Sequence, residues 1–263
     1  MALRNAVVWI TGASSGIGEA LVAPLVARGA RVAISARRAD LLDAQAARWQ
    51  ARGADVRAYP LDVTDRPGTR LVVERVLHDF GQIDLAVLNA GNHATPKTRP
   101  FDGQQYVDNM TLNFFGMIYG IEAVLPGMLA RGRGHIAGIS SLAGIRPLPT
   151  AGAYGASKAA ASHMLDAIRF DLEPRGVLVT NVTPGFVRTP LTDRNKYRMP
   201  FLMEVDRAAE ILADGLERGK REIHFPKPLS WTIKTLRVLP YPLYSWIIRK
   251  ATGDRQKLAK SVG

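Results

Sequence analysis

The sequence predicts a doubly wound α/β fold, in which helices cover both faces of a parallel sheet. Short apolar segments alternate with amphipathic segments at an interval typical of strand–helix–strand units. Because two parallel strands need a crossover between them, this alternation favours a parallel sheet. With 263 residues and 47% apolar content, the chain can bury one substantial core.

Six segments are expected to form buried strands, because they are rich in apolar or β-branched residues and are bounded by Gly, Pro or polar turns. The predicted strands are 6–10, 31–36, 55–59, 84–88, 134–139 and 177–182. Helical periodicity predicts helices over 19–28, 40–52 and 66–80. Pro24 should kink or loosen the first of these helices, since proline lacks the amide donor of an interior turn.

A glycine-rich turn, TGASSGIG at residues 11–18, follows the first predicted strand. In a doubly wound fold, this first strand-to-helix turn is where a dinucleotide binds. Thr11-Gly12 closes the strand, Gly16 lets the backbone approach a pyrophosphate, and Gly18 lets the helix pack closely on the sheet. The free amides at the helix start can then face the phosphates.

A tyrosine and a lysine four residues apart form a second constellation. Tyr154 and Lys158 occupy positions i and i+4, which share one face of a helix. A free phenol has a pKa of about 10, so it needs a neighbouring cation to act as an acid or base near neutral pH. The spacing also occurs by chance on solvated helices, and its weight here comes from the independent glycine-rich turn.

Together these motifs resemble the short-chain dehydrogenase/reductase family. The matching elements follow the family's order and intervals over most of the chain: TGASSGIG at 11–18, NAG at 89–91, Asn113, Ser141, YGASK at 154–158 and Pro184-Gly185. One departure is Leu88, which stands where the family often has a further asparagine. The resemblance implies a Rossmann-type fold and an oxidoreductase that transfers hydride between a nicotinamide cofactor and a carbonyl or secondary alcohol.

The resemblance also implies catalytic roles for four residues. Tyr154 would give a proton to a carbonyl oxygen or take one from an alcohol, and Lys158 would favour the phenolate and hold the nicotinamide ribose. Asn113 would place a water that relays protons to the lysine, and Ser141 would steady the substrate oxygen. The family's interval to the tyrosine selects Ser141 over Ser140. The alternative for Asn113 is a helix-internal amide, and for Ser141 a strand-end cap.

The end of the second predicted strand bears on cofactor choice. A carboxylate there would favour NAD by bonding the ribose 2′-hydroxyl. Ala36 stands there instead, followed by Arg37 and Arg38, so we expect NADP(H) in preference to NAD(H), with Arg37 on the 2′-phosphate and Ser14 lending a hydroxyl. By resemblance, further cofactor contacts are expected from Ser15, Ile17, Asp62, Val63, Asn89, Ala90, Gly91, Tyr154, Lys158, Pro184, Gly185, Val187 and Thr189.

Residues 188–206 occupy the position of the family's mobile substrate lid. The apolar residues of this segment are Met199, Phe201, Leu202 and Met203. They would suit a bulky apolar substrate that resembles a steroid, a lipid or a ketone, or they would dock the lid on the protein. His93, just past the NAG turn, could reach the pocket mouth, and the alternative is a surface histidine.

The C-terminal part carries most of the net charge of +12. Residues 1–217 hold 24 Lys and Arg against 21 Asp and Glu, whereas residues 218–263 hold 11 against 2. Four prolines limit 225–250 to at most two short helices. We divide the chain into a dinucleotide-binding and catalytic domain, 1–225, and a basic amphipathic extension, 226–263. The extension could rest on an anionic membrane, shield the lid or pack on the body of the protein or on a neighbouring subunit.

Composition argues against several classes of function. The chain has no cysteine, which excludes disulfides and zinc-thiolate sites, and we expect no metal site. No nucleic-acid-binding module is recognisable. No apolar run reaches the ~20 residues that cross a bilayer, and the N-terminus leads straight into a strand, so we expect a cytoplasmic protein.

Two functions from different classes are compatible with these motifs. The first is an enzyme, expected to be a homodimer or homotetramer, that acts on a small-molecule carbonyl or alcohol. The second is a catalytically silent dinucleotide-binding sensor or scaffold at a membrane surface. The presence of Asn113, Ser141, Tyr154 and Lys158 together favours the enzyme.

Overall fold

A computed structural model describes residues 2–93, 101–193 and 199–251. Within them the chain forms a seven-stranded sheet in the order β3-β2-β1-β4-β5-β6-β7, and every pairing is parallel. The strands are β1 Val7–Thr11, β2 Arg31–Ser35, β3 Val56–Ala58, β4 Leu85–Leu88, β5 Gly134–Ile139, β6 Val177–Pro184 and β7 Glu222–Phe225. The predicted doubly wound fold and its six strands are confirmed, and β7 is an addition.

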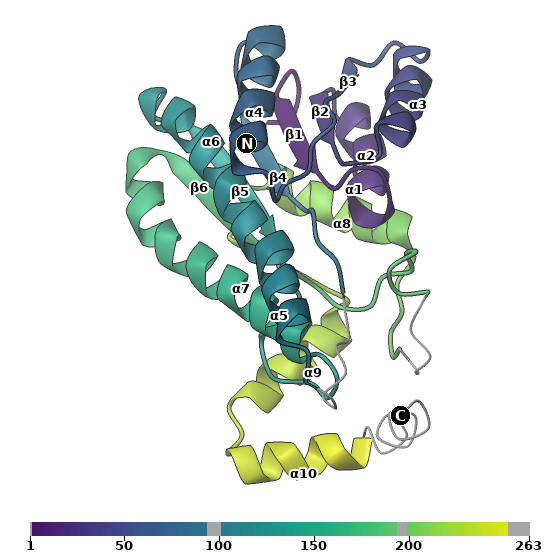
Figure 1. Ribbon diagram of the computed structural model, residues 1–263, viewed down its shortest axis with the longest axis vertical. Coiled ribbons are helices and arrows are strands. Elements are labelled where there is room, and N and C mark those ends of the chain that lie inside the picture. Colours follow the sequence, from purple (N-terminus) through teal and green to yellow (C-terminus); the bar gives the residue numbers. More distant parts are fainter. Residues whose placement is uncertain (1, 94–100, 194–198, 252–263) are drawn as a thin grey trace.

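Helices lie on both faces of this sheet (Figure 1). They are α1 Gly16–Ala20, α2 Val22–Ala27, α3 Ala39–Gln50, α4 Arg66–Phe80, α5 Gly103–Met110, α6 Gly116–Ala130, α7 Gly152–Leu172, α8 Val205–Glu217, α9 Lys227–Arg237 and α10 Tyr241–Ala251. Side chains alternate along a strand, so Val8 and Ile10 of β1 enter one core while Val7 and Trp9 enter the other. The sheet therefore separates two apolar cores.

The first predicted helix is divided at Leu21 into α1 and α2. Pro24 lies in α2, and its ring nitrogen has no hydrogen to donate to the carbonyl of Ala20 one turn earlier. The expected loosening by Pro24 is confirmed, and both short helices still pack their apolar residues on the sheet.

One helical stretch, Gly103–Ala130, joins α5, a π-helical turn Thr111–Phe115 and α6. By length and composition alone, it is the one described helix apolar enough to cross a membrane. In the fold, however, α6 packs on α4, β4 and β5, and Met117, Val124 and Met128 are buried in the second core. The stretch is therefore a core helix that carries Asn113.

The tail forms two helices, as expected, over the residues that are described. β7 pairs with β6, and α9 begins directly after it. Figure 1 shows α9 and α10 beyond the carboxyl ends of the strands, at the end of the molecule that also holds the start of α7. Residues 194–198 of the predicted lid and 252–263 of the extension lie outside the described residues.

Candidate active site

The site lies at the carboxyl ends of β1 and β4, neighbouring strands whose chain connections leave toward opposite edges of the sheet. Such a switch point leaves a crevice for a ligand in doubly wound folds. A cavity of about 540 Å³ opens there. The predicted residues that line it are Gly12, Ser14, Ser15, Gly16, Ile17, Arg37, Asp62, Val63, Asn89, Ala90, Gly91, Tyr154, Lys158, Pro184, Gly185, Val187 and Thr189.

The glycine-rich turn is held close to the end of β4. Gly12 has a φ of +69°, and a Cβ atom on it would lie 2.7 Å from the Cα of Ala90. Gly18 lies behind the cavity wall, where a Cβ atom would come within 2.4 Å of Nδ2 of Asn89. Both positions exclude a side chain, which agrees with the tight turn and close helix packing expected from the sequence.

Asn89 ties the turn to the sheet. Its Nδ2 donates to the carbonyl oxygens of Thr11 at 3.0 Å and Gly12 at 3.2 Å. The hydroxyl of Thr11 accepts in return from the backbone N–H groups of Asn89 and Ala90. Leu88, which stands where the family often has a further asparagine, is buried in the second core. The side chain of Asn89 makes its bonds to the turn without a second asparagine.

Asn113 lies in the π-helical turn, buried behind the cavity wall. Its Oδ1 accepts from the backbone N–H of Asn92 at 2.8 Å, and its Nδ2 donates to the Asn92 carbonyl and to Oγ of Ser157, each at 3.0 Å. Ser157 donates in turn to the carbonyl of Tyr154 at 2.8 Å. π-Helical turns recur at functional sites, and this one connects the segment after NAG to the helix that carries Tyr154.

Lys158 and Tyr154 project from α7 into the cavity, as their spacing predicts. The Nζ of Lys158 lies 5.9 Å from the centre of the Tyr154 ring and donates to the carbonyl of Ile139 at 2.7 Å. Burial lowers the pKa of Lys158 to about 8, because desolvation disfavours the charged form. The pKa of this ammonium therefore lies close to physiological pH.

The structure does not place Ser141 among the residues that line the cavity. Its Oγ accepts from the N–H of Ala143 at 3.1 Å, capping the short helical turn Leu142–Gly144, and lies 3.5 Å from the carbonyl oxygen of Pro184. This is the strand-end cap that the sequence left open as the alternative. Ser140 does line the cavity, but its hydroxyl donates to the carbonyl of Lys158 at 2.7 Å. The catalytic role of Ser141 stays a prediction.

The arginine that bonds Ser14 is Arg38. Its guanidinium donates to Oγ of Ser14 at 2.9 Å, and both residues line the cavity. Arg37, the residue singled out by the sequence, also lines the cavity, but its side chain is 71% exposed and lies 3.9 Å from the carboxylate of Asp62. Sequence spacing marks the pair of arginines but cannot choose between them.

Ala36, Arg38, Ser140 and residues 190–192 of the predicted lid also line the cavity, although the sequence assigned none of them a cofactor contact. The lining residues that were not anticipated from the sequence are Leu61, Asn92, Leu112 and Ile139. The Oγ1 of Thr192 donates to the carbonyl of Val187 at 2.7 Å and accepts from the N–H of Thr189 at 2.9 Å. Thr192 therefore shapes the backbone where the predicted lid leaves the sheet.

The two described ends of the lid are joined. Arg188 N–H donates to the carbonyl of Met203 at 2.8 Å, and Met203 N–H donates to the carbonyl of Phe186 at 3.0 Å. Met203 packs against the first core, whereas Phe201 is 56% exposed. Met203 therefore docks the lid on the protein, whereas Phe201 remains exposed.

His93 is half-buried and lies close to Tyr154. Its ring meets the Tyr154 ring edge to face, with centroids 4.6 Å apart and an interplanar angle of 80°. The sequence allowed two positions for His93, the mouth of the pocket or the surface. The structure shows a half-buried side chain that contacts Tyr154.

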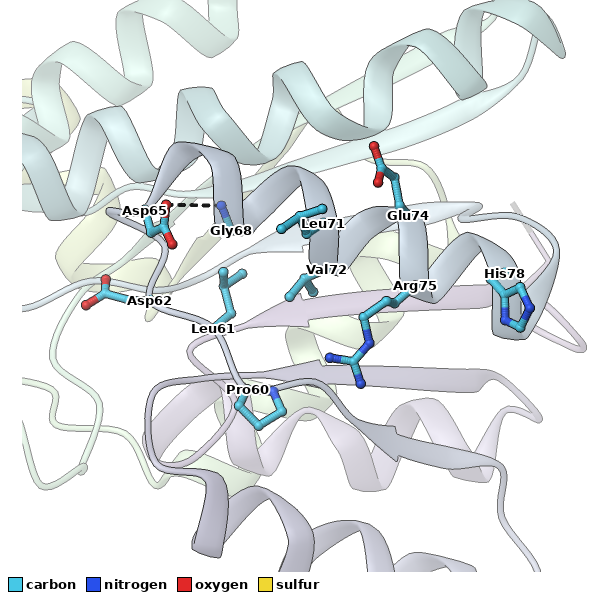
Figure 2. A pocket seen from close by; sticks show the side chains of 10 residues that line it. All are labelled: Pro60, Leu61, Asp62, Asp65, Gly68, Leu71, Val72, Glu74, Arg75 and His78. Carbon is cyan, nitrogen blue, oxygen red and sulfur yellow. Dashed lines mark hydrogen bonds between the residues drawn. The ribbon is translucent and has the colours of Figure 1, made fainter.

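A second, more open hollow of about 600 Å³ lies along α4 (Figure 2). Asp65 caps the start of that helix by accepting from the N–H of Gly68 at 3.0 Å. Leu61 and Asp62 belong to both hollows, but Tyr154 and Lys158 line only the first. We assign the site to the cavity at the carboxyl ends of β1 and β4, because Tyr154 and Lys158 line it together with the glycine-rich turn.

The residues present fit a dinucleotide. One cavity holds a turn whose Gly12 and Gly16 carry no side chain, two guanidinium groups after the end of β2, and the Tyr154–Lys158 pair near the start of α7. Cationic groups suit the phosphates of such a ligand, and the buried lysine suits its ribose hydroxyls.

Comparison with known proteins agrees with this geometry. Residues 6–199 match the model of the short chain dehydrogenase family. An uncharacterized oxidoreductase of Myxococcus xanthus is 40% identical over 250 residues, which cover 95% of this chain and 98% of the relative.

Two solved structures share the fold. A short chain dehydrogenase/reductase of Burkholderia phymatum in complex with NAD is 22% identical, with a TM-score of 0.82 over 89% of this chain and 93% of that one. The alcohol dehydrogenase of the archaeon Thermococcus sibiricus, complexed with 5-hydroxy-NADP, is 26% identical, with a TM-score of 0.77 over 84% of this chain and 96% of that one. The chain thus belongs to the short-chain dehydrogenase/reductase family of oxidoreductases, whose fold implies a nicotinamide dinucleotide cofactor.

Proposed function

We propose that this protein is an NADP(H)-dependent oxidoreductase that interconverts a carbonyl and a secondary alcohol on an apolar substrate. The observation that carries the proposal is the placement of Tyr154 and Lys158 in the same cavity as the glycine-rich turn. Bound there, the nicotinamide would supply or accept the hydride.

The residues of the chain would handle the proton. In the direction of reduction, the Tyr154 hydroxyl gives its proton to the carbonyl oxygen as that oxygen gains charge. The Lys158 ammonium stabilises the resulting phenolate. Asn113 holds the Asn92 segment and Ser157, and so positions α7 relative to the NAG turn. Ser141 would steady the substrate oxygen only if its hydroxyl turned from the cap of the 142–144 helical turn toward the cavity.

The preference for NADP(H) is supported by the groups at the end of β2. Among the residues that line this part of the cavity, Ala36 stands where a carboxylate would favour NAD, and Arg37 and Arg38 follow it. Arg38 and Ser14 are already hydrogen-bonded, so a guanidinium and a hydroxyl would meet a 2′-phosphate together. Comparing catalytic efficiency with NADPH and NADH tests this preference, and a preference for NADH would overturn it.

An apolar substrate is supported by the apolar side chains at the site. Leu112 and Leu191 line the cavity, and Phe201 of the predicted lid is exposed. Steroid-like, lipid-like and long-chain ketones are the expected substrates. A screen of NADPH oxidation against ketosteroids, long-chain ketones, quinones and small aldehydes would identify the class.

The mechanism is tested by Tyr154→Phe, which removes only the hydroxyl. The variant should lose carbonyl reduction while it still binds NADPH, because the cradle around the glycine turn is untouched. Fluorescence titration with NADPH and a turnover assay give the two readouts. Near-normal turnover by the variant would refute the mechanism.

We further propose a cytoplasmic protein that assembles as a homodimer or homotetramer, by analogy with its family. Light scattering of the purified protein measures the assembly. Cell fractionation measures the location, and recovery in the membrane fraction after a high-salt wash would contradict a cytoplasmic or peripheral protein.

A further inference from the structure

The C-terminal helices and the turn between them leave five large apolar side chains exposed. Exposed fractions are 60% for Trp231, 80% for Val238, 68% for Tyr241, 45% for Leu243 and 60% for Trp246. We name these five residues the C-terminal surface. We propose that the C-terminal surface binds the interface of an anionic lipid membrane.

Cations outnumber carboxylates around this surface, where Glu222 pairs with Lys234. Residues 223–251 contain no Asp or Glu, and their cations are Lys227, Lys234, Arg237, Arg249 and Lys250. Lys250 lies 5.3 Å from the Trp246 ring, and Lys234 lies 5.7 Å from the Trp231 ring while it pairs with Glu222 at 2.8 Å. Exposed tryptophans that alternate with cations match a headgroup region, where rings enter the interface and ammonium groups meet lipid phosphates.

The opposite side of the helices is fixed to the domain. Tyr244 is 3% exposed, and its hydroxyl donates to the carbonyl of Pro147. The guanidinium of Arg146 lies 4.4 Å from the Tyr244 ring and donates to the carbonyl of Leu239 at 2.8 Å. These contacts fix the orientation of α10, so the residues of the C-terminal surface that it carries stay exposed in the folded protein.

A second copy of the chain fits this surface less well than a membrane does. A twofold contact would place the same surface of each copy against the other. The cations of residues 223–251 would then be brought close to those of the other copy, and Glu222, which already pairs with Lys234, is the carboxylate beside them. Like charges brought together disfavour such a contact, whereas anionic headgroups would neutralise them.

The docking side of these helices also reaches the proposed active site. Arg146 and Pro147 lie in the segment between Ser141 and Tyr154, and Leu229 of α9 packs over Gly185, which lines the cavity. A membrane-bound protein would therefore hold its substrate side near the lipid, where an apolar ketone partitions. This consequence rests on the proposed function, whereas the binding itself does not.

The experiment is co-sedimentation of the full chain with phosphatidylcholine vesicles and with vesicles that also contain phosphatidylglycerol. We expect binding to the anionic vesicles that weakens as salt is added. Arg249→Gln and Lys250→Gln should each weaken it by about fivefold, since a Lys or Arg near an anionic surface contributes about 1 kcal/mol. The matched control is Arg48→Gln with Arg52→Gln on α3 and the turn after it, where both cations also lie over a tryptophan, Trp49.

Tryptophan fluorescence gives an independent readout. Anionic vesicles should shift the emission of the wild type to shorter wavelength, and Trp231→Phe with Trp246→Phe should remove that shift while binding persists. Tyr154→Phe should bind vesicles as the wild type does, which separates the membrane proposal from the enzymatic one. Absence of binding by the wild type would overturn the proposal. Self-association in light scattering that Trp246→Ser abolishes would assign the surface to a second copy.

Discussion

The ammonium of Lys158 donates to the carbonyl oxygen of Ile139 at 2.7 Å, in a position where only 4% of the residue is exposed. Burial there lowers its pKa to about 8. Holding the charged lysine in this buried position lowers the free energy of unfolding, because the ammonium is better solvated in the unfolded chain. Groups with shifted pKa values of this kind are concentrated at functional sites.

Lys158→Met should therefore stabilise the cofactor-free protein at pH 7. The unfolded lysine has a pKa of about 10.4, so between pH 8 and about 10 the unfolded chain binds more protons than the native one, and the free energy of unfolding of the wild type rises with pH. The full difference integrates to about 3 kcal/mol. Urea unfolding at pH 7 and about pH 9.5 should capture about 2 kcal/mol of it, because the unfolded lysine is still mostly protonated at pH 9.5.

The variant should show a higher free energy of unfolding at pH 7 and no lysine-dependent rise with pH. Lys220→Met, at an exposed lysine, is the control and should leave that rise intact. Burial raises the pKa values of Tyr59 and Tyr244, which acts in the opposite direction above about pH 10, so the window ends there. An equal rise in wild type and Lys158→Met would contradict the assignment.

The sequence predicted the sheet better than the site because strands carry a local signal and site contacts do not. Apolar composition marks β1 to β6, and Pro24 marks the break between α1 and α2. β7 has two polar residues, Glu222 and His224, among its four, so it is recognised by pairing with β6 and not by its composition. The glycine turn and the Tyr154–Lys158 pair are local patterns and could be predicted.

Contacts between distant segments could not be predicted in the same way. The bond from Arg38 to Ser14 spans 24 residues, and the bond from Asn113 to Ser157 spans 44. The first depends on how the segments after β1 and β2 meet, and the second on how the π-helical turn packs against α7. The cap made by Ser141 likewise follows from the short turn Leu142–Gly144, which composition alone does not indicate.

Gly18→Ala should weaken both the fold and cofactor binding. A Cβ atom there would come within 2.4 Å of Nδ2 of Asn89 and 2.5 Å of the Gly12 carbonyl oxygen, so Asn89 would lose its bonds to the turn. We expect a loss of about 1–3 kcal/mol in the free energy of unfolding, typical of overpacking, and a weaker affinity for NADPH. Gly103→Ala is the matched control, because its Cβ would meet only the Phe101 ring at 3.8 Å. Thermal unfolding and NADPH titration measure both effects, and equal behaviour of the two variants would count against a tight turn.

Arg38→Ala should raise the KM for NADPH more than Arg37→Ala does. Both side chains are exposed, but Arg38 is held by hydrogen bonds to Ser14, whereas Arg37 lies 3.9 Å from the Asp62 carboxylate, so Arg38 keeps a defined position for a 2′-phosphate. A hydrogen bond to a charged group contributes about 1.5–3 kcal/mol, which corresponds to about a 10- to 150-fold effect. The KM for NADH should stay nearly constant in both variants. Steady-state kinetics with each cofactor measures the two KM values. An equal rise in KM for NADPH and NADH would show that Arg38 does not bind the 2′-phosphate.

His93 should act as a positioning residue for Tyr154. Its ring packs edge to face on the tyrosine with centroids 4.6 Å apart, and its backbone N–H is held by Oδ1 of Asn92 at 2.8 Å, which a side-chain substitution leaves in place. An aromatic pair contributes about 0.5–1.5 kcal/mol, so His93→Ala should lower kcat by about two- to tenfold without changing the affinity for NADPH. His93→Phe should restore most of the rate because it keeps an aromatic edge. His163→Ala, at an exposed position on the same helix as Tyr154, should not affect kcat. If Phe failed to restore the rate, the imidazole itself and not its packing would be the active feature.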